Sequence, residues 1–496
     1  MQRLFRTELI FLVVLFIGLF AIAARNVTDP DVWWHLKTGQ YIAEHKNVPH
    51  TDLFSFTRIG QPWVAHEWLT ELLLYQIQRI AGWGGLIVVF AVVVSAAFFL
   101  LYLRCGPASY IAGMATLYAA WATAPVWGVR PQVLSLLLTS LWLLILERSE
   151  RHPKVLCWTL PLTLLWVNLH AGFAVGLALS ALFLTGGWME RAFRSSSQQD
   201  VRHFRTSALI LLLDLLLVPL NPNGPLLFSY PIETLRSTAM QKYIDEWASP
   251  NFHHAEYWPF LLLLLGSLAA LGYSRHQVRL RDLLLLLVSL YAGLGSMRLV
   301  PLFVLIAVPL VSKRLGNWPK SSSQQKGPRA AALRLLNGTI MLAMVGFAGI
   351  HTTRLLQRQP QVEMEHFPAR AVDSLQAHPP ASPLFNSYNW GGYLIWRLYP
   401  STPVFIDGRA DLYEKQLLDE FADTYQFKGD WRRALQSWAI KTVMVPNDSA
   451  LATGLRKSPG WTVIYEDAQC VVLTTADDPH GSELAPGILN RANPGQ

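Results

Sequence analysis

The chain has 496 residues, of which 52% are hydrophobic and only 15% are charged, and its formal net charge is +8. Soluble globular proteins usually carry about 25% charged residues. This composition therefore excludes a large water-soluble protein, and its apolar fraction excludes a disordered or collagen-like chain.

The first apolar run covers Leu9 to Ala24 and follows a short basic segment. Ala21-Ile-Ala23 matches the small-residue pattern of a signal-peptide cleavage site, but the run is long for a signal core, and we interpret it as an uncleaved first helix. The later runs that are long enough to cross a bilayer cover about 84–103, 107–126, 131–147, 155–170, 171–190, 206–221, 257–274, 281–297, 299–313 and 331–350. The sequence therefore predicts about eleven membrane-spanning helices.

The distribution of Lys and Arg predicts the orientation of these helices. If the N-terminus is cytoplasmic, most Lys and Arg of the membrane half fall in cytoplasmic loops, as the positive-inside rule requires. Those loops are Arg104, 147–154, 190–205, 275–281 and 313–334, and the part 313–327 is interpreted as a polar linker. The loop 25–83, the loop 222–256 and the tail after residue 350 then lie outside. The basic charge thus indicates orientation, and we expect no nucleic-acid partner.

The first outer loop begins with acids, histidine and tryptophan. Asp31 is placed to cap a helix that runs to about His45, so that Asp29, Asp31 and His35 cluster at its start beside Trp33. A helix N-terminus favours anions, and two acids there would suit a divalent cation, such as Mg²⁺ or Mn²⁺, that bridges a phosphate. The alternative is a capping Asp followed by tryptophans of the membrane interface, and the pattern leaves both open.

The same loop continues into an amphipathic stretch from Trp63 to Ala81, in which apolar residues follow helical spacing. We expect a helix that lies on the outer membrane surface. His66 and Glu67 occur at its start and are candidate catalytic residues, although they form no HExxH motif.

Further polar residues map to the same outer face. Arg130 opens a helix, His170 lies at the turn of a helix pair, Asp245 and Glu246 lie in the next long outer loop, and Arg298 separates two apolar runs. Each alone has an ordinary explanation, such as a helix start or a snorkelling arginine. Ionisable groups at the membrane are also candidate functional residues, and the two arginines would suit a lipid-linked phosphate.

The tail after residue 350 is less hydrophobic and alternates short strands with helices, which predicts a small α/β domain. The predicted strands lie near 383–386, 403–407, 441–445 and 469–474, and the predicted helices cover 365–377, 412–425 and 430–437. Asp407 and Arg409 follow one strand and are candidate substrate-binding residues. An internal Asp–Arg pair is the alternative interpretation.

Two parts of the sequence resemble known enzymes. The segment from Asp29 to Gly60, with Asp-Pro, aromatic residues, a helix and a Pro…Asp pair, is similar to the first outer loop of oligosaccharyltransferase catalytic subunits, and the layout resembles the GT-C glycosyltransferases. Asn389-Trp-Gly-Gly-Tyr393 resembles the Trp-Trp-Asp-Tyr-Gly motif of oligosaccharyltransferases, although the family's Asp is absent.

The resemblance implies a GT-C-like transmembrane domain over residues 1–350 that includes the loop 25–83, and an extracytoplasmic α/β domain over 351–496. It implies that Asp29 or Asp31 serves the catalytic centre as a base or a metal ligand, and that Trp390 contributes to substrate binding. We expect a glycosyltransferase of the cell envelope, in the bacterial inner (plasma) membrane. Its partners would be a polyprenyl-phosphate-linked sugar and a glycan, lipid or protein acceptor. A flippase for a lipid-linked glycan and a noncatalytic scaffold are the alternatives.

Overall fold

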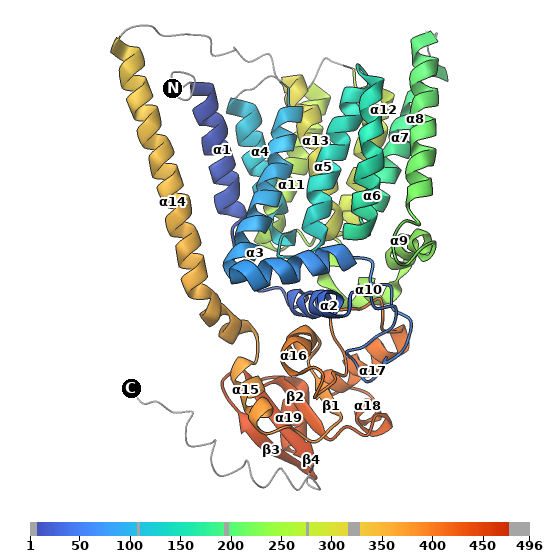
Figure 1. Ribbon diagram of the computed structural model, residues 1–496, viewed down its shortest axis with the longest axis vertical. Coiled ribbons are helices and arrows are strands. Elements are labelled where there is room, and N and C mark those ends of the chain that lie inside the picture. Colours follow the sequence, from blue (N-terminus) through green and yellow to red (C-terminus); the bar gives the residue numbers. More distant parts are fainter. Residues whose placement is uncertain (1–6, 107–109, 193–197, 274–276, 316–327, 476–496) are drawn as a thin grey trace. The chain divides into compact units, whose positions relative to one another are not determined.

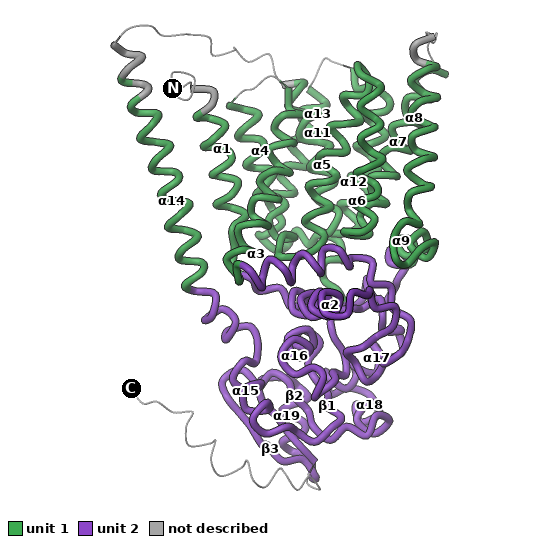
Figure 2. Tube along the Cα trace, in the orientation of Figure 1, with its two compact units in different colours: residues 1–26, 81–233, 244–357 green, residues 27–80, 234–243, 358–496 purple. Residues whose placement is uncertain are grey.

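The computed structural model describes residues 7–106, 110–192, 198–273, 277–315 and 328–475. They form two compact units, which Figure 2 shows in different colours. The first unit comprises residues 1–26, 81–233 and 244–357, and the second comprises residues 27–80, 234–243 and 358–496. Most of the predicted cytoplasmic linker, residues 316–327, lies outside the described residues.

The first unit is built from helices joined by short connections (Figure 1). Its sequences are apolar around the whole helix, which is typical of helices surrounded by protein or lipid. The helices are α1 (Thr7–Ala23), the later part of α3 (Trp68–Arg104), α4 (Tyr110–Thr123), α5 (Gln132–Ser149), α6 (Thr159–Leu169), α7 (Phe173–Ala192), α8 (Gln198–Leu217), most of α9 (Leu226–Arg236), α11 (Trp258–Tyr273), α12 (Leu280–Gly295), α13 (Val300–Leu315) and the first part of α14 (Pro328–His366). The 3₁₀ helices between them are η1 (Ala124–Val126), η2 (Pro153–Trp158), η3 (Asp245–Trp247), η4 (Ala255–Tyr257) and η5 (Met297–Leu299).

Helix α3 contains two helical parts separated at Gly82. This residue has φ 59° and ψ −158°, a backbone conformation that is essentially restricted to glycine. The amphipathic stretch expected to end near Ala81 and the apolar run expected from residue 84 are therefore confirmed as separate helical segments. The first segment begins at Trp68 rather than at Trp63.

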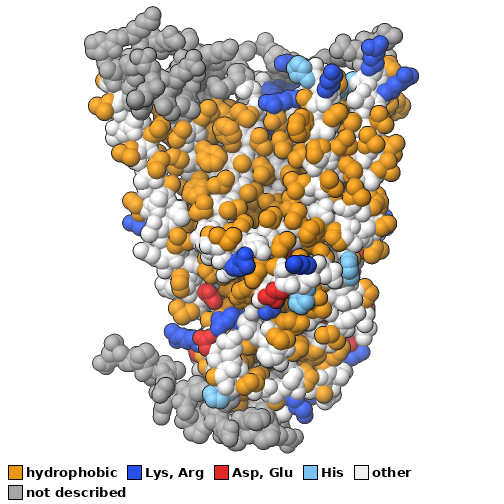
Figure 3. All heavy atoms as spheres, in the orientation of Figure 1, with side chains coloured by type: hydrophobic (Ala, Val, Ile, Leu, Met, Phe, Trp, Pro, Cys, Tyr) orange, Lys and Arg blue, Asp and Glu red, His pale blue; other side chains and the backbone are white. Residues whose placement is uncertain are grey.

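Apolar side chains cover much of the face of the helical unit that Figure 3 shows. Leucines on α8, α11 and α14, including Leu216, Leu262 and Leu342, are exposed. Among the residues that the structure describes, five helical segments are long and apolar enough to cross a membrane, namely Trp68–Arg104, Gln132–Ser149, Phe173–Ala192, Ala255–Tyr273 and Leu335–His366. An exposed apolar surface of this extent indicates contact with lipid. The total of about eleven spans stays a prediction.

Ion pairs and hydrogen bonds connect the loops at each end of the helical unit. The guanidinium of Arg104 lies 2.8 Å from the Glu147 carboxylate, and the Lys313 ammonium lies 3.0 Å from the same carboxylate. These residues belong to three different loops that the charge pattern assigns to the cytoplasm. At loops assigned to the outer side, Arg25 donates a hydrogen bond of 2.7 Å to the carbonyl of Ala124. Loops that the charge pattern assigns to the same side therefore contact one another.

The second unit combines the first outer loop with the tail. Its helices are α2 (Val32–His45), the first part of α3, α10 (Thr238–Tyr243), the end of α14, α15 (Ala369–Ala377), η6 (Tyr388–Trp390), α16 (Gly391–Leu398), α17 (Lys415–Tyr425), α18 (Arg432–Ser437) and α19 (Ala450–Arg456). Its strands are β1 (Leu384–Asn386), β2 (Thr442–Pro446), β3 (Trp461–Glu466) and β4 (Cys470–Thr475).

The strands form a four-stranded sheet of order β1-β2-β4-β3. Strands β1 and β2 are parallel, with Phe385 opposite Val443, whereas β4 runs antiparallel to both of its neighbours. The fully buried valines and leucines of β2 and β4 form the centre of its core. The strand expected at 403–407 instead makes a single parallel bridge, between Val404 and Ser55.

That bridge ties the first outer loop to the tail. Val404 donates a backbone hydrogen bond of 3.1 Å to the carbonyl of Phe54, and Phe56 donates one of 3.0 Å to the carbonyl of Val404. The buried indole of Trp33 packs edge-on against Tyr393, with ring centroids 4.7 Å apart. The structure therefore groups residues 27–80 with the tail, although the sequence places them inside the membrane half.

Candidate functional site

The acids at the start of α2 are held by short local hydrogen bonds. The backbone N–H of Asp31 donates to Asp29 Oδ1 at 2.9 Å, and the indole N–H of Trp34 donates to Asp31 Oδ1 at 3.2 Å. Asp31 is the N-cap residue of α2, but its side chain makes no capping hydrogen bond. The predicted helix, with Asp31 at its N-cap and His45 at its end, is therefore confirmed, whereas the Asp31 carboxylate accepts a hydrogen bond from the Trp34 indole instead of capping the helix. Asp29 is buried, and Asp31 is half-buried.

Gly408 of the tail lies directly against the Asp31 carboxylate. A Cβ atom at this position would clash with Asp31 Oδ1, and it would lie 3.2 Å from Trp34 Nε1. Only a residue without a side chain fits this approach. The tail therefore forms one wall beside the Asp31 side chain.

Behind Trp34, a chain of histidines and glutamates connects α2 to the start of α3. The ring of His35 packs against Trp34 at a tilt of 36°, with centroids 3.6 Å apart. Its Nδ1 lies 3.3 Å from Glu71 Oε1, and its Nε2 lies 3.6 Å from Glu67 Oε2. The other oxygen of Glu67 lies 3.0 Å from His66 Nε2. Three of the predicted catalytic residues, His35, His66 and Glu67, are thus brought together.

The electrostatic surroundings of His66 favour its charged form. Burial alone would lower the pKa of His66, but the carboxylates of Glu67 and Asp411 and the carbonyl of Val64 raise it above its ordinary value. Asp411 is an exposed residue of the tail turn that follows Arg409. Acidic groups from the loop and from the tail therefore act on the same imidazole.

Asp407 and Arg409 form the centre of a buried ion-pair network. The guanidinium of Arg409 binds both oxygens of Asp407, at 2.8 and 2.7 Å, and a third contact of 2.7 Å joins it to Asp52 of the first loop. Tyr413 donates a hydrogen bond of 2.6 Å to Asp407. Burial alone would raise the pKa of Asp407, but Arg409 and Tyr413 hold it below its ordinary value.

This arrangement corresponds to the internal Asp–Arg pair that the sequence left as an alternative. Arg409 also lies over the ring of Trp63, 4.8 Å from the centroid. The network fastens the turn that carries Gly408 and Asp411 to the first loop. Direct contact of Asp407 or Arg409 with substrate stays a prediction.

The first unit contains the other predicted charged residues. Arg130 forms an ion pair with Glu246, and the hydroxyl of Ser296 donates a hydrogen bond of 3.0 Å to the carbonyl of Glu246. The Arg298 guanidinium lies 5.4 Å from the centroid of the Trp247 ring. The start of α5, η3 with its Asp245, and η5 are therefore joined, and they bring two arginines and two carboxylates into one region of this unit.

His170 lies at the turn between α6 and α7 of the first unit. Its Nδ1 accepts a hydrogen bond of 2.8 Å from the backbone N–H of Gly172 and lies 2.8 Å from Ser135 Oγ, which accepts a bond from the Trp166 indole. These contacts fix the orientation of the imidazole. A role in substrate binding stays a prediction for His170.

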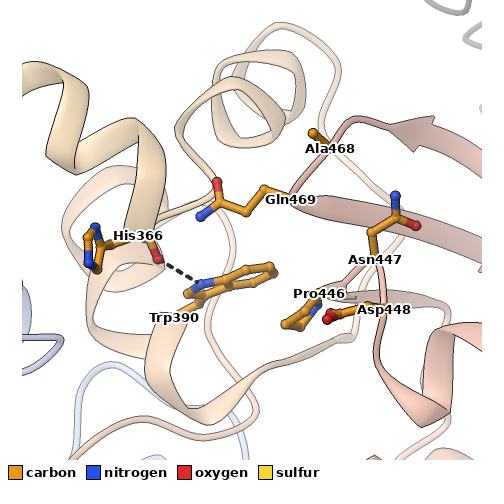
Figure 4. A pocket seen from close by; sticks show the side chains of 7 residues that line it. All are labelled: His366, Trp390, Pro446, Asn447, Asp448, Ala468 and Gln469. Atoms are coloured by element: carbon orange, nitrogen blue, oxygen red, sulfur yellow. Dashed lines mark hydrogen bonds between the residues drawn. The ribbon is translucent and has the colours of Figure 1, made fainter.

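Trp390 lies in the second unit, beside an open depression of about 620 Å³ (Figure 4). Its indole N–H donates to the carbonyl of His366 at 3.2 Å. The two glycines that follow it are needed for packing, because a Cβ on Gly391 would clash with the backbone of Ile406, and one on Gly392 would lie 2.5 Å from the carbonyl of Pro30.

Asp29 and Asp31 were also expected to be metal ligands. Within the described ranges of the chain, no group of three or more His, Cys, Asp or Glu residues has an arrangement that could hold a metal ion. Both carboxylates accept hydrogen bonds from protein N–H groups. A divalent cation there would need further ligands from its substrate or from solvent.

Sequence reasoning missed Glu71 and Gly408. Glu71 follows Glu67 by one helical turn on an amphipathic helix, so helical spacing places both carboxylates on one face. Gly408 carries no comparable signal, because its contact with Asp31 depends on the tertiary fold.

No protein-family model and no curated protein sequence matches this chain. Solved structures do match it along most of its length. One is ArnT from Cupriavidus metallidurans, solved with bound undecaprenyl phosphate; it is 12% identical, the match covers 94% of this chain and 97% of that one, and the TM-score is 0.52. Another is the oligosaccharyltransferase of Archaeoglobus fulgidus, at 11% identity, 89% and 70% coverage and a TM-score of 0.51.

A third is the arabinofuranosyltransferase AftD from Mycobacteria, at 14% identity and a TM-score of 0.53. That match covers 95% of this chain but only 42% of the longer AftD chain. At these identities the similarity concerns the fold. The chain therefore has a fold like that of the GT-C glycosyltransferases.

Proposed function

We propose that the chain is a membrane glycosyltransferase that takes a sugar from a polyprenyl-phosphate carrier at the outer face of the bacterial inner membrane. The GT-C-like fold supports glycosyl transfer as the class of reaction. The undecaprenyl phosphate in the ArnT structure supports a polyprenyl carrier as donor. The long apolar helices support a membrane location.

The observation that carries the proposal is the placement of Asp31. Its carboxylate is half-buried, accepts a hydrogen bond from the Trp34 indole, and faces a backbone position that only glycine can occupy. Asp29 is more buried and supports the backbone of Asp31 through Oδ1. Between the two acids, Asp31 is therefore the proposed general base, and Asp29 is the positioning residue.

In the proposed reaction, an acceptor oxygen or nitrogen attacks the anomeric carbon of the donor sugar. The bond from that carbon to the phosphate oxygen breaks, and its electron pair leaves with the phosphate. Asp31 takes the proton that the acceptor loses. Arg130 and Arg298 would stabilise the charge on the departing phosphate, while His35, His66 and Glu67 would maintain the electrostatic surroundings of Trp34 and Asp31.

The test is transfer by the purified full chain in lipid nanodiscs, with a panel of radiolabelled polyprenyl-phosphate sugars and a membrane extract as acceptor. Asp31→Asn should lower transfer by at least about 100-fold, the usual contribution of a general base, and Asp29→Asn should lower it less. Glu44→Gln, at the exposed end of α2, is the matched control and should keep full activity. Full activity of the Asp29→Asn, Asp31→Asn double variant would overturn the assignment.

A further inference from the structure

The depression beside Trp390 lies where an α/β sheet usually binds ligands. Strands β1 and β2 are parallel neighbours, and both point their carboxyl ends toward it. Asn447 and Asp448 follow β2 directly, and Trp390 follows β1 within one short turn. In open α/β sheets, ligands bind outside the carboxyl ends of parallel strands. The volume of the depression, about 620 Å³, lies within the ordinary range for small-ligand sites.

The floor of this depression, which we call the Trp390 pocket, is apolar and rigid. Figure 4 shows the rings of Trp390 and Pro446 side by side. The indole is fixed by its hydrogen bond to the carbonyl of His366, and most of the ring is buried, so that only a small part of it faces the pocket. The exposed edge of the indole and the Pro446 ring together form a small apolar contact surface, which suits a ligand that also has an apolar face.

The rim is polar, and its side chains are held in place by the surrounding loops. The Asn447 amide donates a hydrogen bond of 2.8 Å to the carbonyl of Asp467. The Gln469 amide donates one of 2.9 Å to the carbonyl of Glu365. This bond uses one of the two amide hydrogens of Gln469, and its carbonyl oxygen can act as an acceptor for a ligand. Asp448 is exposed and adds a carboxylate.

The charge of the pocket determines the class of ligand. Its lining contains one carboxylate, one histidine and no Lys or Arg. The nearby Arg456 donates to the carbonyl and the amide oxygen of Asn447 and is paired with Glu466 at 2.8 Å, so its charge is already compensated. Phosphates and other anions are therefore disfavoured, because their recognition relies on cationic side chains. A rim of acceptors requires a ligand that offers several donors, and hydroxyl groups meet this requirement. The combination of hydroxyl donors and an apolar ring face is that of a sugar.

We propose that the Trp390 pocket binds a neutral oligosaccharide, which lays one sugar ring on Trp390 and Pro446 and donates hydroxyl hydrogen bonds to Asp448 and Gln469. This site uses none of the residues at Asp31. It goes beyond the proposed transfer reaction, because binding here requires neither a donor lipid nor a catalytic base. In a glycosyltransferase, such a site would retain a glycan acceptor.

The test is saturation-transfer-difference NMR, followed by calorimetry, on the full chain in nanodiscs. The probes are mannotriose, maltotriose and cellotriose, with trigalacturonate as the charged analogue. At least one neutral trisaccharide should bind, and trigalacturonate should not. Asp448→Ala should weaken that binding by about tenfold or more, which is typical for the loss of a hydrogen bond to a charged group. Asp423→Ala is the matched control, since Asp423 lines a different depression beside α17.

Absence of binding by every neutral probe would overturn the proposal. So would an equal loss in Asp423→Ala, tight binding of trigalacturonate, or displacement of the sugar by an uncharged peptide. The binding experiment contains no donor lipid and is therefore independent of the transfer assay. A chain that binds the trisaccharide here but transfers no sugar in that assay would refute the proposed enzyme and leave this site intact.

Discussion

His66 and Glu67 form a buried pair in which the charge of the imidazole depends on the neighbouring carboxylate. Burial acts to lower the pKa of His66, but Glu67 and Asp411 raise it above 6.5. Protonated His66 is thus stabilised by folding, and this contribution is fully present below pH 6.5 and is lost as the pH rises through the higher pKa of the folded state. The thermal unfolding midpoint should therefore fall as the pH rises above neutrality.

Glu67→Gln should remove most of that dependence, because it takes away the carboxylate 3.0 Å from His66 Nε2. The measurement is thermal unfolding of the full chain in detergent from about pH 5 to about pH 9, a range that brackets the ordinary histidine pKa. Glu44→Gln on α2 serves as control and should keep the dependence of the native chain. An unchanged slope in Glu67→Gln would show that His66 does not titrate against this partner.

The members of this cluster could be predicted only in part. Asp29, Asp31 and His35 share the start of one helix, and His66 and Glu67 share the start of the next, so local spacing was sufficient to select them. Asp411 and Gly408 reach the same region from the tail through the bridge between Ser55 and Val404. No local pattern encodes that pairing, because both segments are irregular on either side of it.

At the level of elements, the division of α3 at Gly82 depends on a single residue. Its φ of 59° and ψ of −158° are strained for any residue with a Cβ, and such conformations cost about 1–3 kcal/mol. No other atom lies within 4 Å of the position that a Cβ would take, so this cost is conformational rather than steric. Gly82→Ala should lower the free energy of unfolding by that amount.

The matched control is Gly349→Ala in α14, where a Cβ likewise meets nothing within 4 Å and the backbone is helical. It should be neutral or stabilising by up to about 1 kcal/mol, because alanine favours a helix over glycine. Thermal unfolding of the two variants measures the difference. Equal stability of the two variants would mean that the backbone at position 82 can adopt another conformation without a loss of folding free energy.

The sequence predicted the tail helices within a few residues, since α15, α17 and α18 have clear amphipathic patterns. The strand β3 and the helix α19 were not predicted. Two further elements were predicted but differ in the structure. The expected strand near 403–407 finds only one partner residue, Ser55, and so remains a single bridge. The amphipathic helix begins five residues late because Trp63 donates a backbone hydrogen bond of 2.8 Å to His50, which keeps the chain extended before Trp68.

At the scale of the whole molecule, contacts at the two ends of the helical unit agree with the sides to which the charge pattern assigns the loops. Arg279 lies 2.7 Å from Glu150, and the Arg281 backbone N–H donates to Glu190 at 3.0 Å, so loops assigned to the cytoplasm meet one another. At loops assigned to the outer side, the Asn221 amide donates to the carbonyl of Val167 at 2.7 Å. These contacts show which loops lie at the same end of the helical unit, and the excess of Lys and Arg predicts which end is cytoplasmic.

The native cysteines allow that orientation to be tested. Cys157 is exposed in η2, next to a loop assigned to the cytoplasm, whereas Cys105 and Cys470 are buried. Burial also raises the pKa of the Cys470 thiol, and a protonated thiol reacts poorly with maleimides. In the native chain, maleimide labelling of Cys157 therefore reports on the face assigned to the cytoplasm. An exposed residue of α17, changed by Gln416→Cys in a Cys157→Ser background, provides the signal for the tail.

A membrane-impermeant maleimide applied to intact spheroplasts should label the Gln416→Cys variant. It should label Cys157 of the native chain only after the membrane is permeabilised. The Cys157→Ser chain without the new cysteine sets the background and should remain nearly unlabelled in both conditions. The reverse pattern would invert the orientation and would move Asp31 and the tail to the cytoplasmic side. A transferase with Asp31 on the cytoplasmic side would use a donor in the cytoplasmic leaflet instead of the outer one. The side of labelling therefore also determines in which leaflet the lipid-linked sugar must lie.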